Sequence, residues 1–97
     1  MGPPDTVHGG VIAAMIDESF GMLVGTIIKQ EVRTIKEEVS FRNPAKIGDT
    51  LYIEARLKAE KNRAFIVTAT VRSGRDIIAE ATGTLLKMKI NHSKAKE

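Results

Sequence analysis

The sequence predicts an α+β domain in which an antiparallel sheet is wrapped around one long helix. Three observations carry this prediction. An apolar segment runs from Val11 to about Lys29, which is too long for an ordinary strand. Apolar and polar residues then alternate with a period of two through most of the remaining chain, as in half-buried strands. Short turns rich in Gly, Asn, Asp and Ser separate the alternating runs, and such turns join antiparallel neighbours.

The predicted helix follows His8-Gly9-Gly10 and is rich in Ala, Met, Ile and Leu, which favour helices. It is apolar on nearly all sides, and this pattern is typical of a helix buried in a core. The same segment is long enough to suggest a membrane span. Asp17 and Glu18 stand at its centre, and charges there argue against insertion. We therefore expect a core helix and no membrane partner.

The alternating part of the chain predicts four strands and the turns between them. The strands are expected at residues 34–43, 50–60, 64–73 and 77–89. Glu37 interrupts the apolar face that Ile35 and Val39 would otherwise form. Because the connections are short, we expect a meander in which each strand pairs with the next one. Such a sheet hides its apolar face by curling around the helix.

Length and composition indicate one small domain. The chain has 97 residues, and we assign all of 1–97 to one domain with a core at 8–88 and a polar tail at 89–97. A domain of this size buries a limited core, so oligomerisation is expected. The absence of cysteine excludes disulfides and cysteine nucleophiles. No signal peptide is visible, and we expect a cytoplasmic protein.

The charge balance leaves two interpretations open. The formal net charge is +3, which fits either a solvated surface or attraction to a polyanionic ligand that carries a nucleotide. Only four aromatic residues are present, too few to build a stacking platform, so no nucleic-acid partner is expected. His8 and His92 lack the spacing of metal ligands, so no zinc site is expected.

Asp17 is the carboxylate that most needs an explanation, because it lies in the middle of the apolar helix. An unpaired charge in an apolar site is costly, and such a site raises the pKa of a carboxyl group toward the range of a general base. The other interpretation is a structural ion pair at the surface or with a partner subunit. We take the neighbouring Glu18 as a secondary or structural carboxylate.

The two glycines at the start of the helix suggest a second functional group. Backbone N–H groups at a helix start are unsatisfied, and the helix dipole adds positive potential there. Gly9 could thus stabilise a carbonyl oxygen that gains negative charge, although a plain glycine turn explains Gly9-Gly10 as well. Asp17 follows Gly9 by eight residues, or about 12 Å of helix. One reacting group cannot touch both within a chain, so this chemistry implies a dimer with antiparallel helices.

The segment from His8 to Glu18 (HGGVIAAMIDE) closely resembles the HGG-x6-D/E signature of hotdog-fold thioesterases of the PaaI-like and 4-hydroxybenzoyl-CoA types. Two later segments resemble the same family. Residues 41–49 (FRNPAKIGD) match its strand-turn pattern F-x-x-P-A-x-x-G-D, and residues 79–84 (AEATGT) match its last-strand pattern A-x-A-T-G-T. The resemblance extends over residues 8–88, and the three motifs occur in the family's order.

The resemblance implies a hotdog fold, an acyl-CoA thioesterase activity and a homodimer or homotetramer with the acyl-CoA at the subunit interface. Asp17 would act as general base or nucleophile, and the Gly9 N–H would polarise the thioester carbonyl. Thr34 occupies a strand position whose hydroxyl can hold the attacking water. No cofactor is implied, since CoA is part of the substrate. We add His8, Gly10, Asn62 and Arg63 as candidate substrate-binding residues.

Two departures from the family pattern leave an alternative open. Many relatives carry Asn or Gln about six residues before the histidine, where this chain has Gly2. Relatives also have a strand before the HGG motif, and we expect this N-terminal strand to be missing here, which would expose the edge of the strand near 50–60. The alternative function is a catalytically weak hotdog module that binds acyl-CoA or serves in assembly. A hotdog dehydratase ranks lower, because His8 precedes the helix.

Overall fold

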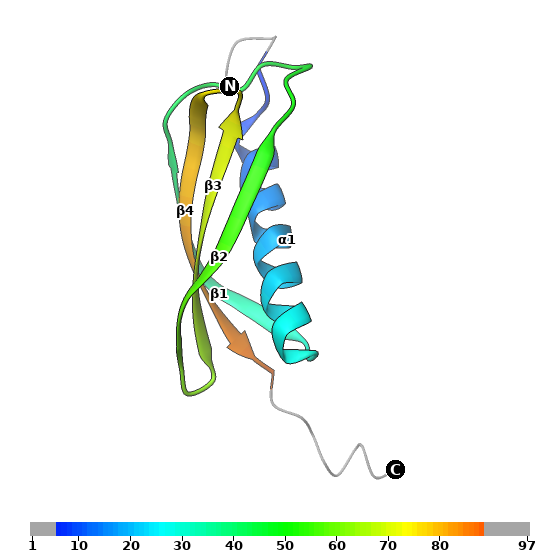
Figure 1. Ribbon diagram of the computed structural model, residues 1–97, viewed down its shortest axis with the longest axis vertical. Helices are drawn as coiled ribbons and strands as arrows, with labels where there is room; N and C mark the ends of the chain where they lie inside the picture. Colours follow the sequence, from blue (N-terminus) through cyan, green and yellow to red (C-terminus); the bar gives the residue numbers. More distant parts are fainter. Residues whose placement is uncertain (1–5, 89–97) are drawn as a thin grey trace.

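The computed structural model describes residues 6–88, and it contains one helix packed on one sheet (Figure 1). The elements are α1 (Gly9–Ile28), β1 (Val32–Phe41), β2 (Tyr52–Lys61), β3 (Ala64–Ser73) and β4 (Asp76–Lys87). The helix runs along one face of the sheet and contacts all four strands. The predicted α+β class and the sheet wrapped around one helix are therefore confirmed. The predicted polar tail at 89–97 lies outside the described residues.

The strand order is β1-β4-β3-β2, and all neighbours are antiparallel. The predicted meander is wrong for the first pair, because β1 and β2 lie at opposite edges of this sheet. The ten residues 42–51 connect them, and three strand spacings amount to only about 14 Å. The loop of residues 42–51 is thus long enough to reach the far edge of the sheet, and its length did not require β1 and β2 to pair. β2 forms an edge of the described sheet, as expected for the strand near 50–60.

The loop after β1 is held by its own motif residues. The Lys46 N–H donates to the Asp49 carboxylate at 2.9 Å, and the Asp49 N–H donates to the Lys46 carbonyl at 3.0 Å. Gly48 between them has a φ of 97°, a conformation that favours glycine. Ala45 is buried in the core. The pattern P-A-x-x-G-D thus encodes a turn that carries the chain from one edge of the sheet toward the other.

The core lies between one stripe of α1 and the inner face of the sheet. Ile12, Ile16, Phe20 and Val24 recur at every fourth position of the helix and are buried. They meet inward-facing residues of the two central strands, which are Phe65, Val67, Ala69, Val71, Ile78, Ala79, Ala81 and Leu85. Alternation along β3 and most of β4 produces this face, since every second side chain points inward. The consecutive residues Ile78 and Ala79 are both buried at a point where the register of β3 and β4 shifts.

The prediction that α1 is buried on nearly all sides is wrong for the single chain. Val11 is 51% exposed, Met22 66% and Ile27 50%, because one sheet covers only one side of a helix. The mean hydropathy over an 18-residue window of α1 is 1.7, and its 20 residues are long enough to cross a membrane. Packing across the sheet accounts for one apolar stripe of this helix and leaves other apolar side chains exposed.

Gly83 provides a stability prediction from the packing of this core. A Cβ at Gly83 would lie 2.7 Å from Phe20 Cε2 and 3.4 Å from Val67 Cγ2, and both side chains are fully buried. Gly83→Ala should lower the free energy of unfolding by about 1–3 kcal/mol through overpacking. Gly21→Ala is the matched control, because a Cβ there meets nothing within 4 Å and alanine favours a helix interior. Urea unfolding of both variants checks this, and equal stability of the two would contradict it.

Candidate active site

His8 caps the N-terminus of α1 and occupies most of the amides there. Its ring Nδ1 accepts a hydrogen bond from the Gly10 N–H at 2.9 Å, and its carbonyl accepts from the Val11 N–H at 3.0 Å and the Ile12 N–H at 3.4 Å. The histidine ring therefore anchors the start of the helix. Within residues 6–88, the Gly9 N–H has no hydrogen-bond partner. It is therefore the amide left available at the positive end of the helix.

The surroundings of Gly9 explain why the helix begins with this glycine. A Cβ at Gly9 would lie 3.2 Å from Phe41 Cζ, at the end of β1. Phe41 is itself 52% exposed. A shallow cleft of about 330 Å³ opens beside the two residues and is lined also by Val7 and Ile12. The glycine thus allows close packing at the helix tip beside a cleft that a small group could enter.

Asp17 lies two turns further along α1, on the side that faces β1. The sequence led us to expect an apolar site for this carboxylate, and the single chain corrects that expectation, because Asp17 is exposed. Its side chain approaches Glu37 of β1 closely enough for a side-chain hydrogen bond between the two carboxyl groups. The packing of α1 against β1 therefore places two acidic side chains, Asp17 and Glu37, next to each other.

Glu37 is the acidic group with the perturbed ionisation. Burial, then the charge of Asp17, then the hydrogen bond to Asp17 raise the pKa of Glu37 from 4.5 to about 7. Glu37 pairs across the sheet with Gly83, and its neighbour Val39 pairs with Ala81, so its side chain points toward the core face. Glu37 Oε1 is buried and has no hydrogen-bond partner among the described residues. Such an environment favours the neutral acid.

The raised pKa of Glu37 makes stability depend on pH. The folded chain keeps this proton up to about pH 7, whereas the unfolded chain releases it near its ordinary value. Stability is therefore fully present below that ordinary value and declines as the pH rises through about 7. We expect Glu37→Gln to remove this decline, while Glu38→Gln, on the outer face beside Lys36, retains it. Denaturant unfolding at pH 5 and pH 8 measures the difference, and an unchanged decline in Glu37→Gln would contradict it.

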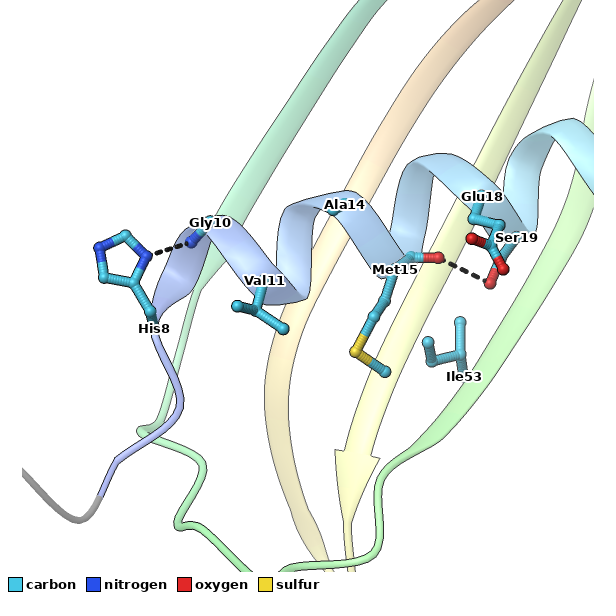
Figure 2. Close-up of a pocket in the computed structure, with 8 residues that line it drawn as sticks. All are labelled: His8, Gly10, Val11, Ala14, Met15, Glu18, Ser19 and Ile53. Carbon is cyan, nitrogen blue, oxygen red and sulfur yellow. Dashed lines mark hydrogen bonds between the residues drawn. The ribbon is translucent and has the colours of Figure 1, made fainter.

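A larger groove lies on the other side of the helix, between α1 and the edge strand β2. It encloses about 570 Å³. Its lining comprises His8, Gly10, Val11, Ala14, Met15, Glu18, Ser19 and Ile53 (Figure 2). Glu18 points into this groove, whereas Asp17 does not line it. Ser19 Oγ donates to the Met15 carbonyl at 2.9 Å. The carboxylates of Asp17 and Glu18 thus point to different sides of the helix, because adjacent helical residues are about 100° apart around the axis.

The remaining predicted residues lie apart from Asp17 in the single chain. Thr34 is half-buried on the inward side of β1 and pairs with Leu85. It lies three residues from Glu37, roughly 10 Å along an extended strand. Asn62 and Arg63 form the two-residue turn between β2 and β3, at the end of the sheet away from the start of α1 (Figure 1).

Local structure accounts for part of the Asn62-Arg63 turn. Asn62 has a φ of 56°, a left-handed conformation that asparagine tolerates better than most residues. Arg63 donates to the Lys87 carbonyl at 2.8 Å. The guanidinium is exposed and has further N–H groups available for an anion. The substrate-binding roles of both residues stay predictions.

Sequence reasoning missed Glu37 as a site residue, although its signal was present. Glu37 was the acidic interruption of an otherwise apolar face. The strand is interrupted before Glu37 by a bulge, because Thr34 pairs with Leu85 and Lys36 with Thr84. Ile35 is thereby the extra residue and is 54% exposed. The inward face of β1 consequently consists of Val32, Thr34, Glu37, Val39 and Phe41.

Comparisons with known proteins agree with this architecture. The family described as the thioesterase superfamily matches residues 5–80. A curated relative, the acyl-coenzyme A thioesterase THEM4 of Xenopus laevis, is 30% identical over 90 residues, which are 92% of this chain and 40% of that protein. The THEM4 protein of Bos taurus is 29% identical, with 90% of this chain and 36% of that protein covered. The chain therefore spans about two fifths of the length of these relatives.

Solved structures show the same arrangement of helix and sheet. The protein smu.793 of Streptococcus mutans UA159, determined bound to acetyl CoA, is 27% identical with a TM-score of 0.80, over 87% of this chain and 68% of that chain. A phenylacetic acid degradation-related protein of Ralstonia eutropha JMP134 is 28% identical with a TM-score of 0.80, over 89% and 66%. The resemblance inferred from the HGG motif is thus confirmed. With its helix start, mid-helix aspartate and wrapped sheet, this chain belongs to the thioesterase superfamily and has the hotdog fold.

Proposed function

We propose that this chain is an acyl-CoA thioesterase that hydrolyses a thioester to a free acid and CoA. One observation carries the proposal. In a member of the thioesterase superfamily, the unbonded Gly9 N–H and the Asp17 carboxylate stand on one helix, and both lie beside β1. The first is a donor for a developing oxyanion. The second is a base or nucleophile for the carbonyl carbon.

The active unit in this proposal is a homodimer, or a dimer of dimers. Helix α1 is continuous from Gly9 to Ile28, so the two groups are about 12 Å apart along its axis. A second copy with its helix antiparallel would place its Asp17 against the Gly9 N–H of the first. Exposed apolar side chains on α1 and β1 support such contact, among them Met22, Ile35 and Phe41. β1 is also an edge of the described sheet and can pair with another strand.

Two routes for the chemistry are compatible with these groups. As a general base, Asp17 takes a proton from water while the water oxygen attacks the thioester carbonyl. As a nucleophile, Asp17 attacks the carbonyl itself to form an anhydride that water then hydrolyses. In both routes the carbonyl oxygen gains negative charge beside the Gly9 N–H, and the C–S bond breaks to release CoA, whose sulfur takes up a proton. No metal or other cofactor enters this proposal.

Substrate binding in this proposal also uses both copies. Arg63 lies at the end of the sheet opposite the start of α1, and an antiparallel partner would bring its own Arg63 toward that start. Arg63 and Asn62 could there meet the phosphates of CoA, which a guanidinium binds well. His8 and Gly10 shape the entrance beside Gly9, and Thr34 could hold the attacking water. A cytoplasmic location fits this substrate and stays an expectation.

A thiol-release assay on the purified chain tests the proposal. Aromatic, short and long acyl-CoAs are supplied in turn, and free CoA is trapped with a chromogenic disulfide. We expect saturable release for at least one class, in proportion to protein concentration. Saturable CoA binding without thiol release from any substrate would contradict the proposed thioesterase activity. That result would support the second candidate, a catalytically weak hotdog module that binds acyl-CoA.

A further inference from the structure

Glu37 is an acidic residue beside Asp17 that the proposed hydrolysis does not use. It stands on the inward side of β1, across from Gly83, in the layer that holds the buried Phe20. A carboxylate among such neighbours loses hydration and needs a hydrogen-bond donor to compensate. This strand position would pack well if it were aliphatic, as its neighbour Val39 is.

No cation compensates Glu37 among the described residues. The three ion pairs of residues 6–88 join Lys36 to Glu38, Arg42 to Glu80 and Arg56 to Glu54, and none includes Glu37. From β4, the residue paired with it is Gly83, and the next inward residues are Ala81 and Leu85. From α1, the titratable group that faces it is Asp17. Within residues 6–88, Glu37 therefore has one ionisable neighbour, and that neighbour is also acidic.

Two carboxyl groups in hydrogen-bond contact need a proton between them. With both ionised, neither oxygen has a donor and the charges repel. With one proton on Glu37, the contact becomes a hydrogen bond to the Asp17 carboxylate, and charge-assisted bonds of this kind are strong. Asp17 is the exposed member and Glu37 the half-buried one, so the proton belongs on Glu37 and the charge on Asp17.

We propose that Glu37 is a positioning residue that, as the neutral acid, donates its proton to Asp17 and fixes that carboxylate for the hydrolysis. This inference rests on the proposed function and adds a residue to it. The raised pKa of Glu37, to about 7, agrees with a proton held on this residue. Above that pH Glu37 ionises, and the repulsion drives the exposed Asp17 side chain into other rotamers. The hydrogen bond is lost, and kcat should fall.

The test compares two substitutions across a range of pH. Glu37→Gln keeps a neutral donor at every pH, whereas Glu37→Leu fills the space without one. In the parent protein, kcat should decline between pH 6.5 and 8.5 after correction for spontaneous hydrolysis. Glu37→Gln should retain most of kcat and lose the decline. Glu37→Leu should lose roughly 10- to 100-fold in kcat with little change in KM, as a misplaced group does. Glu38→Gln, on the outer face, should behave like the parent.

Two kinetic outcomes would overturn the inference. If Glu37→Gln lost as much kcat as Glu37→Leu, Glu37 would act through its charge and not as a donor. If the decline persisted in Glu37→Gln, another group would cause it. A merely structural Glu37 would leave the pH profiles of all variants alike.

A measurement without turnover separates this inference from the proposed function. Carboxyl carbon-13 resonances of Glu37 can be followed by NMR between pH 4 and 9. We expect a midpoint near 7 in the parent and a lower midpoint in Asp17→Asn, where the neighbouring charge is gone. A midpoint near 4.5 in the parent protein would contradict the proposal that Glu37 shares its proton with Asp17, even if the enzyme were active. A midpoint near 7 in a protein that releases no thiol would support the shared proton between Glu37 and Asp17 and contradict only the proposed thioesterase activity.

Discussion

Asp17→Asn is expected to reduce kcat for acyl-CoA hydrolysis by about 10²–10⁴-fold, because the amide can neither take a proton from water nor attack a carbonyl. The substitution is nearly isosteric, and Asp17 is exposed in the chain, so the fold should not suffer. An asparagine can still contact Glu37. KM should therefore change much less than kcat. Thiol release over a range of acyl-CoA concentrations measures both quantities.

Glu18→Gln is the matched control for Asp17→Asn. It makes the same chemical change one residue further along α1, where the side chain points into the groove beside β2 (Figure 2). Most of the activity should remain. Size-exclusion chromatography should give the parental oligomer for both variants. Parental turnover in Asp17→Asn, or an equal loss in both variants, would remove Asp17 from its proposed role.

Gly9→Pro is expected to reduce kcat by about 10²–10³-fold, because proline deletes the one N–H that is assigned to the oxyanion. The helix should survive the change. Gly9 is the first helical residue after the cap, a position where proline is common. His8 before it has φ −64° and ψ 139°, the extended conformation that a residue preceding proline prefers. The loss should fall on kcat, measured by thiol release, while circular dichroism stays parental.

Gly9→Ala separates the deleted amide from the added bulk. Alanine keeps the N–H but adds the Cβ that would stand 3.2 Å from Phe41 Cζ, and the half-exposed ring can shift by a few tenths of an ångström. Its activity should exceed that of Gly9→Pro by at least about tenfold, since most of the oxyanion stabilisation is retained. Equal losses in the two variants would assign the effect to crowding and not to the amide.

Mixing the two inactive variants tests whether the site is shared between chains. In a mixed dimer, the Asp17→Asn chain supplies an intact Gly9 and the Gly9→Pro chain supplies an intact Asp17. Random reassembly of equal amounts makes half of the dimers mixed, each with one complete site. Activity should then recover to about a quarter of the parental value for a twofold arrangement. No recovery after verified subunit exchange would place both groups in one chain.

Local patterns were sufficient to predict much of this protein. The spacing from His8 to Asp17 identified the helix start and the family. The loop motif predicted a turn, and the structure shows why, since Lys46, Gly48 and Asp49 hold that turn through their own bonds and conformation. Period-two alternation located β3 and β4 within two residues at each end. These features depend on neighbours in the chain, and such interactions are visible in a linear sequence.

Pairings between distant segments could not be derived in that way. Short connections suggested that β1 pairs with β2, yet β1 pairs with β4, because a ten-residue loop can reach either the next strand or the far edge. The bulge at Ile35 shifted the inward face of β1 by one residue, and a shift of one residue reverses the side to which each side chain points. Glu37 was already visible as a departure from the apolar face, but its contact with Asp17 depends on how β1 packs against α1.

The amino-acid sequence alone determined the class of fold, the helix with its histidine cap and the two groups proposed for the chemistry. Only the tertiary structure decided which side of α1 is covered, and it placed Asp17 against Glu37 instead of in an apolar pocket. The physical reason is that the ionisation of a carboxyl group depends on solvent and charge around it in space. Residues twenty positions apart in the chain share that environment only after β1 has packed against the helix.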